Sequence, residues 1–176
     1  MTDIMIPAMA EDGTHYPVEK LDAHRRGLRH LAISAFVFDG DHLLIQRRAD
    51  GKYHCGGLWA NTVCTHPHWG EGFAECATRR LDEELGFTVP LIETGIAEYR
   101  AEVGNGLIEH EVVHMFRGSA RRATLRLAPD PDEVAETRWV TATDLRSEIA
   151  ATPERFTPWF RIYVERWPDF RFGAAA

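Results

Sequence analysis

Residues 61–87 read NTVCTHPHWGEGFAECATRRLDEELGF, and this stretch decides the fold. Its first part holds a thiol, Cys64, and an imidazole two residues later, His66. From Gly70 onward the apolar residues recur with a period near 3.6, and Gly86 stands where a glycine ends a helix. The stretch therefore predicts a polar loop followed by an amphipathic helix.

The predicted helix has one strongly charged face. Arg80, Glu83 and Glu84 stand at positions i, i+3 and i+4, so a base and two acids share that face. Spacing alone favours the ordinary interpretation, in which the face is solvated and carries ion pairs. A functional interpretation needs support from the rest of the chain.

Length and composition limit the classes of protein that fit. A chain of 176 residues with 44% hydrophobic content predicts one domain with a sizeable core. The net charge of −7 argues against nucleic acid as a partner, because a surface that binds a phosphate backbone needs an excess of Lys and Arg. A small anion held in a local basic pocket remains compatible with this charge.

The ends of the chain and its cysteines bear on the compartment. Residues 1–13 lack the features of a secretory signal, and no apolar run approaches the roughly 20 residues of a spanning helix. The three cysteines lack paired spacing, so we expect thiols rather than disulfides or a zinc ribbon. We expect a soluble, cytoplasmic protein without a membrane partner, with residues 1–16 as a mobile arm and residues 17–172 as a single domain.

Outside the central helix the pattern predicts both strands and helices. Asp39-Gly40-Asp41 has the composition of a hairpin turn, and Thr157-Pro158 fits the first positions of a helix. A second predicted helix covers about residues 141–150. Strands are predicted at residues 31–38, 42–48, 91–100, 107–116, 120–128 and 137–140.

Two groups of residues could bind a metal ion. Glu109 and Glu111 alternate onto one face of a strand, about 6.5 to 7 Å apart, where they either converge on a cation or face water. Their apolar neighbours favour a buried strand, in which unpaired carboxylates are costly. His24 and His30 share an ion only if the chain folds back near Gly27; otherwise they are unrelated surface histidines.

The central helix resembles the Nudix box, whose pattern is G-x5-E-x7-R-E-U-x-E-E-x-G-U with U apolar. The pattern departs at two positions, since Thr65 replaces its glycine and Arg80 replaces its second acid. In Nudix hydrolases that acid helps to hold Mg²⁺, and a guanidinium cannot ligate a cation. The matching positions are Glu71, Arg79, Leu81, Glu83, Glu84, Gly86 and Phe87.

With Cys-x-His just ahead of the helix, the same departures resemble the type I isopentenyl-diphosphate isomerases. The likeness extends from about Lys20 to Trp167. It implies an α/β fold, a Nudix-type α/β/α sandwich with a mixed β-sheet. It also implies an enzyme that isomerises isopentenyl diphosphate to dimethylallyl diphosphate in isoprenoid biosynthesis, through a tertiary carbocation. We expect the protein to be a monomer.

The resemblance also implies the role of each site residue. Cys64 and Glu111 would be the pair of proton-transfer groups, with Tyr99 beside Glu111, and which of the pair is the acid stays open. Trp159 would face the carbocation. The diphosphate would be bound by four cations, Lys20, Arg48, Lys52 and Arg80.

Two metal sites are implied by the same resemblance. One would hold Mg²⁺ through Glu84 and the diphosphate oxygens. The other, a mixed nitrogen and oxygen set that suits Mn²⁺ or Zn²⁺, would consist of His24, His30, His66, Glu109 and Glu111.

Two alternatives stay open at this point. Glu83 and Glu84 are also compatible with a Nudix hydrolase of a nucleoside diphosphate derivative. A non-catalytic module that binds metal or prenyl diphosphate is the other. At the level of single residues, Cys64 could be a small buried hydrophobe, and each proposed phosphate ligand could be a solvated surface charge.

Overall fold

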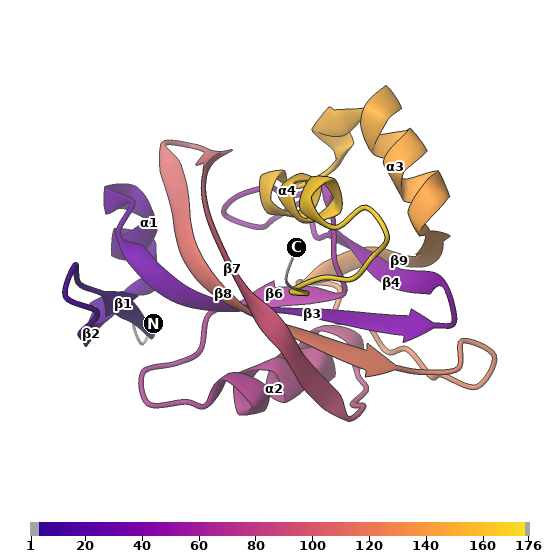
Figure 1. The fold of residues 1–176 in the computed structure, drawn as a ribbon, viewed down its shortest axis with the longest axis horizontal. Helices are drawn as coiled ribbons and strands as arrows, with labels where there is room; N and C mark the ends of the chain where they lie inside the picture. The colour runs from indigo at the N-terminus through magenta and orange to yellow at the C-terminus, as the bar shows by residue number, and fades with distance from the viewer. Residues whose placement is uncertain (1–3, 175–176) are drawn as a thin grey trace.

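The computed structural model describes residues 4–174, in which nine strands form one mixed sheet (Figure 1). Four α-helices and a 3₁₀ turn at Pro153–Arg155 complete the described part of the chain. The helices are α1 (Lys20–Arg26), α2 (Phe73–Leu85), α3 (Ala142–Ala151) and α4 (Pro158–Arg166). The strands are β1 (Met5–Met9), β2 (His15–Glu19), β3 (Arg29–Asp39), β4 (His42–Arg48), β5 (Trp59–Ala60), β6 (Val63–Thr65), β7 (Leu91–Gly104), β8 (Leu107–Ser119) and β9 (Val134–Thr141).

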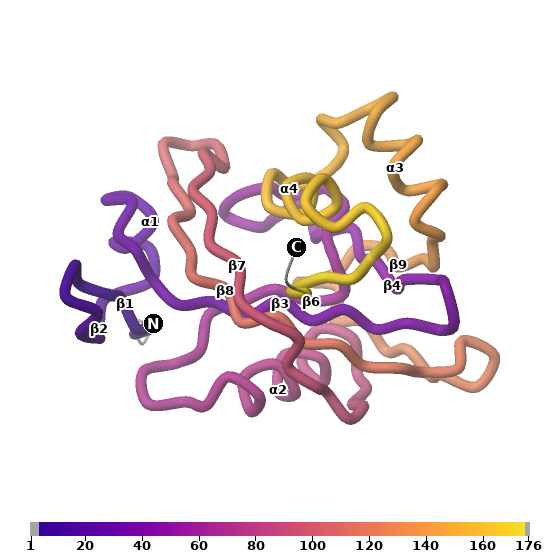
Figure 2. Tube along the Cα trace, viewed as in Figure 1, coloured from indigo at the N-terminus to yellow at the C-terminus, as the bar shows by residue number. Residues whose placement is uncertain are grey.

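Strand β3 is the centre of the sheet. It reads RHLAISAFVFD, an apolar run that is buried along almost its whole length, as expected for a strand covered on both faces. It pairs in parallel with β8, although the two lie far apart in the sequence (Figure 2). It pairs antiparallel with β1, β4 and β6. The two strands that carry Cys64 and Glu111, β6 and β8, therefore both pair with β3.

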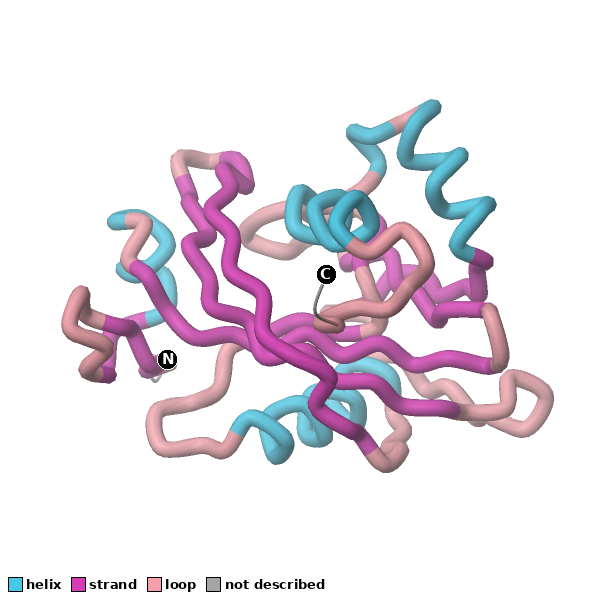
Figure 3. The backbone as a smooth tube through the Cα atoms, viewed as in Figure 1, coloured by secondary structure: helices cyan, strands magenta, loops and turns pink. Residues whose placement is uncertain are grey.

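Helices cover both faces of the sheet (Figure 3). Helix α2 buries Cys76, Ala77, Leu81 and Leu85 in one hydrophobic cluster, and alternate residues of β3 face it. On the opposite face, α4 packs in a second cluster rich in aromatic rings. This arrangement confirms the predicted α/β sandwich with a mixed sheet.

The N-terminal segment differs from the expected arm. Strands β1 and β2 form an antiparallel hairpin, and Ala8 of β1 pairs with His30 at the edge of β3. The side chains of Ile6 and Ala8 are fully buried. The expected boundary between arm and domain at residue 17 falls inside this hairpin. Residues 5–16 are therefore part of the folded domain. Burial of the apolar side chains offsets the entropy lost when this segment is ordered.

A second correction concerns residues 120–128, which were expected to form a strand. They form a turn instead, closed by bonds from the amides of Thr124 and Leu125 to the carbonyl of Arg121. Leu125 and Leu127 pack against the α2 cluster without pairing with another strand. The alternating leucines of this segment therefore reflect packing on helix α2.

Among the described residues, no helix has the length and apolar composition to cross a membrane.

Candidate active site

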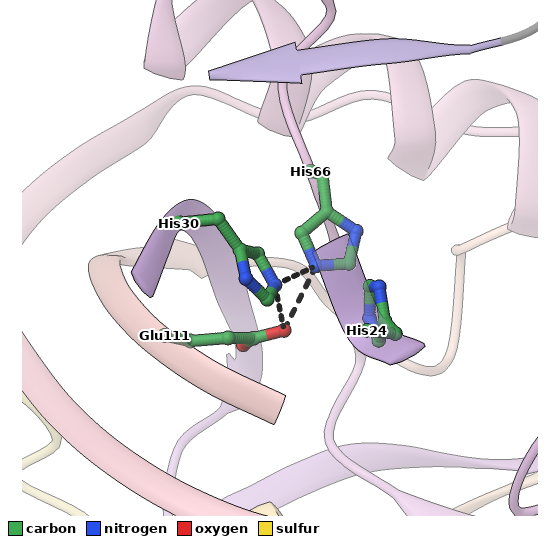
Figure 4. Close-up of side chains that lie close together, drawn as sticks. All are labelled: His24, His30, His66 and Glu111. Atoms are coloured by element: carbon green, nitrogen blue, oxygen red, sulfur yellow. Dashed lines mark hydrogen bonds and ion pairs between the residues drawn. The ribbon is translucent and has the colours of Figure 1, made fainter. Parts of the chain in front are cut away.

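Three histidines and a glutamate converge at one end of β3 (Figure 4). One ligand atom from each of His24, His30, His66 and Glu111 lies within 4.8 Å of those of the others. All four side chains are buried. The expected metal ligands of α1, β3, β8 and the segment after β6 therefore come together, with the exception of Glu109, which lies beside this group.

A left-handed glycine brings the first two histidines together. Gly27 ends α1 with a φ of 60°, and a Cβ there would lie 3.3 Å from Ile108. The chain reverses at this glycine, so the rings of His24 and His30 lie 4.8 Å apart. The fold-back that the sequence required is present.

Backbone carbonyls fix the orientation of both rings. The Nδ1 atom of His24 lies 2.7 Å from the carbonyl oxygen of Lys20, and that of His30 lies 2.7 Å from the carbonyl oxygen of Leu28. Each imidazole therefore turns its Nε2 atom toward the cluster, as metal-binding histidines do. The Nε2 atom of His24 is buried and has no hydrogen-bond partner among the described residues.

The remaining two members come from the segment after β6 and from β8. The Nε2 atom of His66 lies 2.8 Å from Glu111 Oε1 and 3.2 Å from His30 Nε2. Two imidazole nitrogens and a carboxylate oxygen at such distances, in a buried place, fit the donor set of a transition-metal ion. This group could bind a metal.

Tyr99 joins the two strand acids. Its hydroxyl lies 2.7 Å from Glu109 Oε2 and 2.7 Å from Glu111 Oε2, because Tyr99 of β7 faces Glu111 of β8 in the antiparallel register. Burial and the charge of Glu111 raise the pKa of Glu109. Burial also acts to raise the pKa of Glu111, but hydrogen bonds from His30 and His66 outweigh it and hold that pKa well below its usual range. Glu111 is therefore the more acidic carboxyl group of the pair.

Cys64 lies on β6, opposite Ser34 of β3. Its thiol lines one cavity together with Tyr99, Glu109, Glu111 and Trp159. Burial raises the pKa of the Cys64 thiol, so the sulfur carries its proton near neutral pH. The thiol thus lines the same cavity as the strand acids, while the Cys64 side chain also packs against the aromatic cluster.

Trp159 forms a wall of the same cavity. It is buried at the start of α4, and its Nε1 donates to Asn61 Oδ1 at 3.2 Å. The Arg48 guanidinium lies 5.4 Å from its ring centroid, so the ring already faces a positive charge. The cavity therefore has an aromatic surface suited to a cationic group.

Four cations and two acids line the polar side of this cavity: Lys20, Arg48, Lys52, Arg80, Glu84 and Glu133. Burial, followed by the charges of Lys52, Arg80 and Arg48, lowers the pKa of Lys20 to about 8. Burial is the larger cause, and the three neighbouring cations add to it because like charges disfavour the protonated form. This side of the cavity is therefore suited to an anion.

Arg80 is surrounded by carboxylates. Its guanidinium donates to Glu83 at 2.7 Å and to Glu133 at 3.0 Å, and it also bonds Glu84. The other oxygen of Glu84 accepts from Gln46 Nε2 at 2.6 Å. The other arginine of the pair, Arg79, also contacts Glu83, and its two bonds to Glu71 fix the loop ahead of α2.

His54 and Glu133 were not among the residues expected at the site. The His54 ring is buried in the cavity, with Nε2 3.6 Å from Glu109 Oε1. One ligand atom from each of His54, His24 and Glu109 lies within 4.8 Å of the others. No periodicity or motif distinguishes either residue, because His54 belongs to a glycine-rich loop and Glu133 to a turn; only residue type hinted at a role.

Comparison with known proteins adds a family to this geometry. The NUDIX domain family matches residues 28–160. A protein from Cereibacter sphaeroides strain KD131, named isopentenyl-diphosphate Delta-isomerase, is 59% identical over 96% of this chain and 95% of its own length. Proteins of the same name from Rhodobacter capsulatus and Ruegeria pomeroyi are 57% and 51% identical, over 98% and 97% of this chain and 97% and 94% of their own lengths.

Solved structures agree on the fold. A crystal structure from Deinococcus radiodurans superposes with a TM-score of 0.73 at 15% identity, over 92% of this chain and 98% of its own. A MutT NUDIX hydrolase from Burkholderia pseudomallei gives 0.60 at 21% identity, over 79% of this chain and 98% of its own. At these identities the likeness bears on the fold alone, and it confirms the Nudix-type sandwich.

Proposed function

Because the chain belongs to the Nudix superfamily and, within it, to the type I isopentenyl-diphosphate isomerases, we propose that it converts isopentenyl diphosphate to dimethylallyl diphosphate. The observation that carries this proposal is a single cavity lined by a thiol, two strand acids, an aromatic wall and four cations. Each feature answers one need of the reaction. The alkene must be protonated, the cation stabilised, a proton removed and the diphosphate held.

Cys64 and Glu111 are the proton-transfer pair in this proposal. One of the two donates a proton to C4 of the alkene, which leaves a tertiary cation at C3, and the other removes a proton from C2 to form the new double bond. Tyr99 bonds both strand acids and keeps the Glu111 carboxylate in place. Proton transfer needs no redox cofactor, because no electrons are gained or lost.

Trp159 stabilises the cation. Its ring is buried, and a desolvated π-face contributes about 2 kcal/mol toward a nearby cation. The hydrogen bond from Trp159 Nε1 to Asn61 fixes the ring, so no reorganisation is required when the charge develops. Burial also excludes water, which would otherwise trap the carbocation.

The diphosphate binds to Lys20, Arg48, Lys52 and Arg80. Arg80 offers a planar fork that matches phosphate oxygens, and diphosphate oxygens would replace part of its carboxylate partners. Mg²⁺ would be held by Glu84 together with those oxygens, which suits an ion that keeps phosphate and water ligands.

His24, His30, His66, Glu109 and Glu111 would hold Mn²⁺ or Zn²⁺. The buried Nε2 atom of His24, without a partner in the described residues, supports this assignment. When bound, the ion supplies a local positive charge that acidifies a proton on its ligands or their neighbours. We further propose a monomer that acts in the cytoplasm without a nucleic-acid or membrane partner, in line with the net charge of −7.

The test is an isomerisation assay of wild type, Cys64→Ala and Glu111→Gln side by side. Both variants should lose at least about 10²-fold in kcat, the contribution of a positioned proton-transfer group, and should still bind inorganic diphosphate. If metal-loaded wild type with reduced Cys64 converts no isopentenyl diphosphate, the proposal is wrong. Hydrolysis of a nucleoside diphosphate derivative is not better supported, since Arg80 occupies the place of a metal-binding acid.

A further inference from the structure

We propose that His54 is a further ligand of the metal centre and gives it a fourth imidazole. The proposal rests on the metal centre of the proposed function and extends it by one residue. His54 lies on the loop between β4 and β5, outside both the helical motif and the strands that supply the other ligands. It therefore adds a ligand from a part of the chain that the expected set does not use.

The distances place His54 next to two of the other ligands. One ligand atom from each of His24, His54 and Glu109 lies within 4.8 Å of the other two, and two atoms bound to one ion at about 2.1 Å each lie no farther apart than about 4.2 Å. The His54 Nε2 atom is 3.6 Å from Glu109 Oε1, and its ring stacks at 5.7 Å on that of His24. Small side-chain movements are enough to bring these atoms onto one ion.

The surrounding residues hold the His54 ring inside the cavity. Tyr53 and Trp159 contact it edge to face, with ring centroids at 4.3 and 5.9 Å. The backbone is fixed as well, because the His54 carbonyl accepts from Arg48 and because Gly56 packs so tightly that a Cβ there would lie 2.4 Å from the Asp50 carbonyl oxygen. The loop thus presents the imidazole to the other ligands.

A buried histidine usually has a structural role, in which both ring nitrogens find partners. His54 does not fit that description. Its Nδ1 atom is buried without a partner among residues 4–174, and its Nε2 atom lies beyond hydrogen-bond distance of Glu109. His24 shows the same feature at Nε2. The Nε2 atoms of His24 and His54 thus both lack a hydrogen-bond partner among the described residues, which an ion bound by both would explain.

The two groups of ligands share His24, which decides how many ions they hold. The Nδ1 atom of His24 is engaged by the Lys20 carbonyl, so only its Nε2 atom is free to coordinate. One nitrogen lone pair binds one ion. Because the two groups meet at His24, we expect one ion to draw its ligands from both of them, that is from His24, His30, His54, His66, Glu109 and Glu111. With four imidazoles and two carboxylates, the site should prefer Co²⁺ or Zn²⁺, which bind nitrogen ligands well, over Mn²⁺.

The experiment compares ion binding in wild type, His54→Gln and a control, His110→Gln. His110 is a half-buried histidine on the opposite face of β8 that contacts Glu98. Protein stripped of metal is titrated with Zn²⁺ against a chelator and with Co²⁺ followed by visible absorption. We expect one ion per chain in all three proteins, at least tenfold weaker Zn²⁺ binding in His54→Gln, and a changed Co²⁺ spectrum in that variant alone.

A second measurement does not depend on the variant folding. Pulsed electron paramagnetic resonance on Mn²⁺-loaded wild type counts the coordinated imidazole nitrogens and should find four. Three imidazoles in wild type, or unchanged Zn²⁺ affinity and Co²⁺ spectrum in a folded His54→Gln, would overturn the proposal. These readouts are independent of isomerisation, so protein that binds the ion through four imidazoles but converts no substrate would refute the proposed function and leave the ligand assignment standing.

Discussion

Arg80 is the residue that separates this chain from a hydrolytic Nudix box. In the helix it stands where the box has an acid, and its guanidinium contacts three carboxylates, those of Glu83, Glu84 and Glu133. These contacts hold the guanidinium, and Arg80 lines the cavity. A diphosphate must compete with these carboxylates for the Arg80 guanidinium. Its binding therefore depends on the planar, two-pronged geometry of the guanidinium as well as on the charge.

Replacing Arg80 by Lys keeps the charge and removes the fork. We expect about tenfold weaker binding of inorganic diphosphate, equivalent to about 1.4 kcal/mol, because one bidentate charge-assisted contact becomes a single one. Calorimetric titration of both proteins would measure the change. Arg121→Lys serves as a control, since Arg121 is exposed and outside the cavity. Equal affinity in Arg80→Lys and wild type would remove Arg80 from the diphosphate site.

Lys20 makes diphosphate binding sensitive to pH. Burial and neighbouring cations lower its pKa to about 8, so it is an ammonium at pH 7 and mostly neutral at pH 9. The affinity for inorganic diphosphate should therefore fall as the pH rises through 8. Lys20→Arg keeps its charge over this range, so the affinity should fall less in this variant. Because diphosphate titrates equally with both proteins, the difference between the two profiles reports on Lys20 alone. Parallel pH profiles of the two affinities would exclude Lys20 as the titrating group.

Helix α2 ends at a glycine, Gly86, that two features of the structure require: its backbone conformation and the close packing around it. Gly86 has a φ of 71°, and a Cβ there would lie 2.7 Å from the Ala128 Cβ and 2.8 Å from the Ala128 carbonyl oxygen. The helix end is thus packed against the turn that follows β8. Because Glu84 lies two residues earlier, the position of this end also sets the position of the expected Mg²⁺ ligand.

Gly86→Ala and Gly106→Ala separate the two constraints. Both glycines have a φ of 71°, but nothing lies within 4 Å of a Cβ at Gly106. Left-handed strain alone should cost about 1–2 kcal/mol in Gly106→Ala. The contact with Ala128 should add about 1–3 kcal/mol in Gly86→Ala. Urea unfolding measures both, and equal losses would mean that the turn at Ala128 moves away without cost.

Elements with a regular pattern could be predicted from the sequence, and those that depend on distant contacts could not. The period of residues 73–85 identified α2, and alternation placed Glu109 and Glu111 on one face. The β1 hairpin was not predicted, because its apolar side chains are few and gain their burial from α1 and β3. His54 was missed for the same reason, since loop backbone and aromatic neighbours place it at the site.

At the scale of the whole molecule, the site lies where separately packed parts of the chain meet. Two hydrophobic clusters flank the sheet, and a small third one joins the N-terminal hairpin to α1. Helix α1 carries Lys20 and His24. The hairpin is connected to the rest of the molecule by the pairing of Ala8 with His30 of β3 and by the bond from the Trp69 amide to the Met5 carbonyl. The hairpin thus supports one cation and one histidine of the site without sharing the main core.

Ile6→Ala tests whether this third cluster opens on its own. Ile6 is fully buried, and its truncation should destabilise the hairpin by about 2–5 kcal/mol. We expect faster hydrogen exchange across residues 5–26, weaker diphosphate binding through Lys20, and a small change in the global unfolding midpoint. Leu81→Ala, a truncation of similar size in the α2 cluster, should instead lower the global midpoint. Local opening is expected because few contacts bind this small cluster to the rest of the molecule. If both variants lower the global midpoint equally, the hairpin unfolds together with the core and the prediction is wrong.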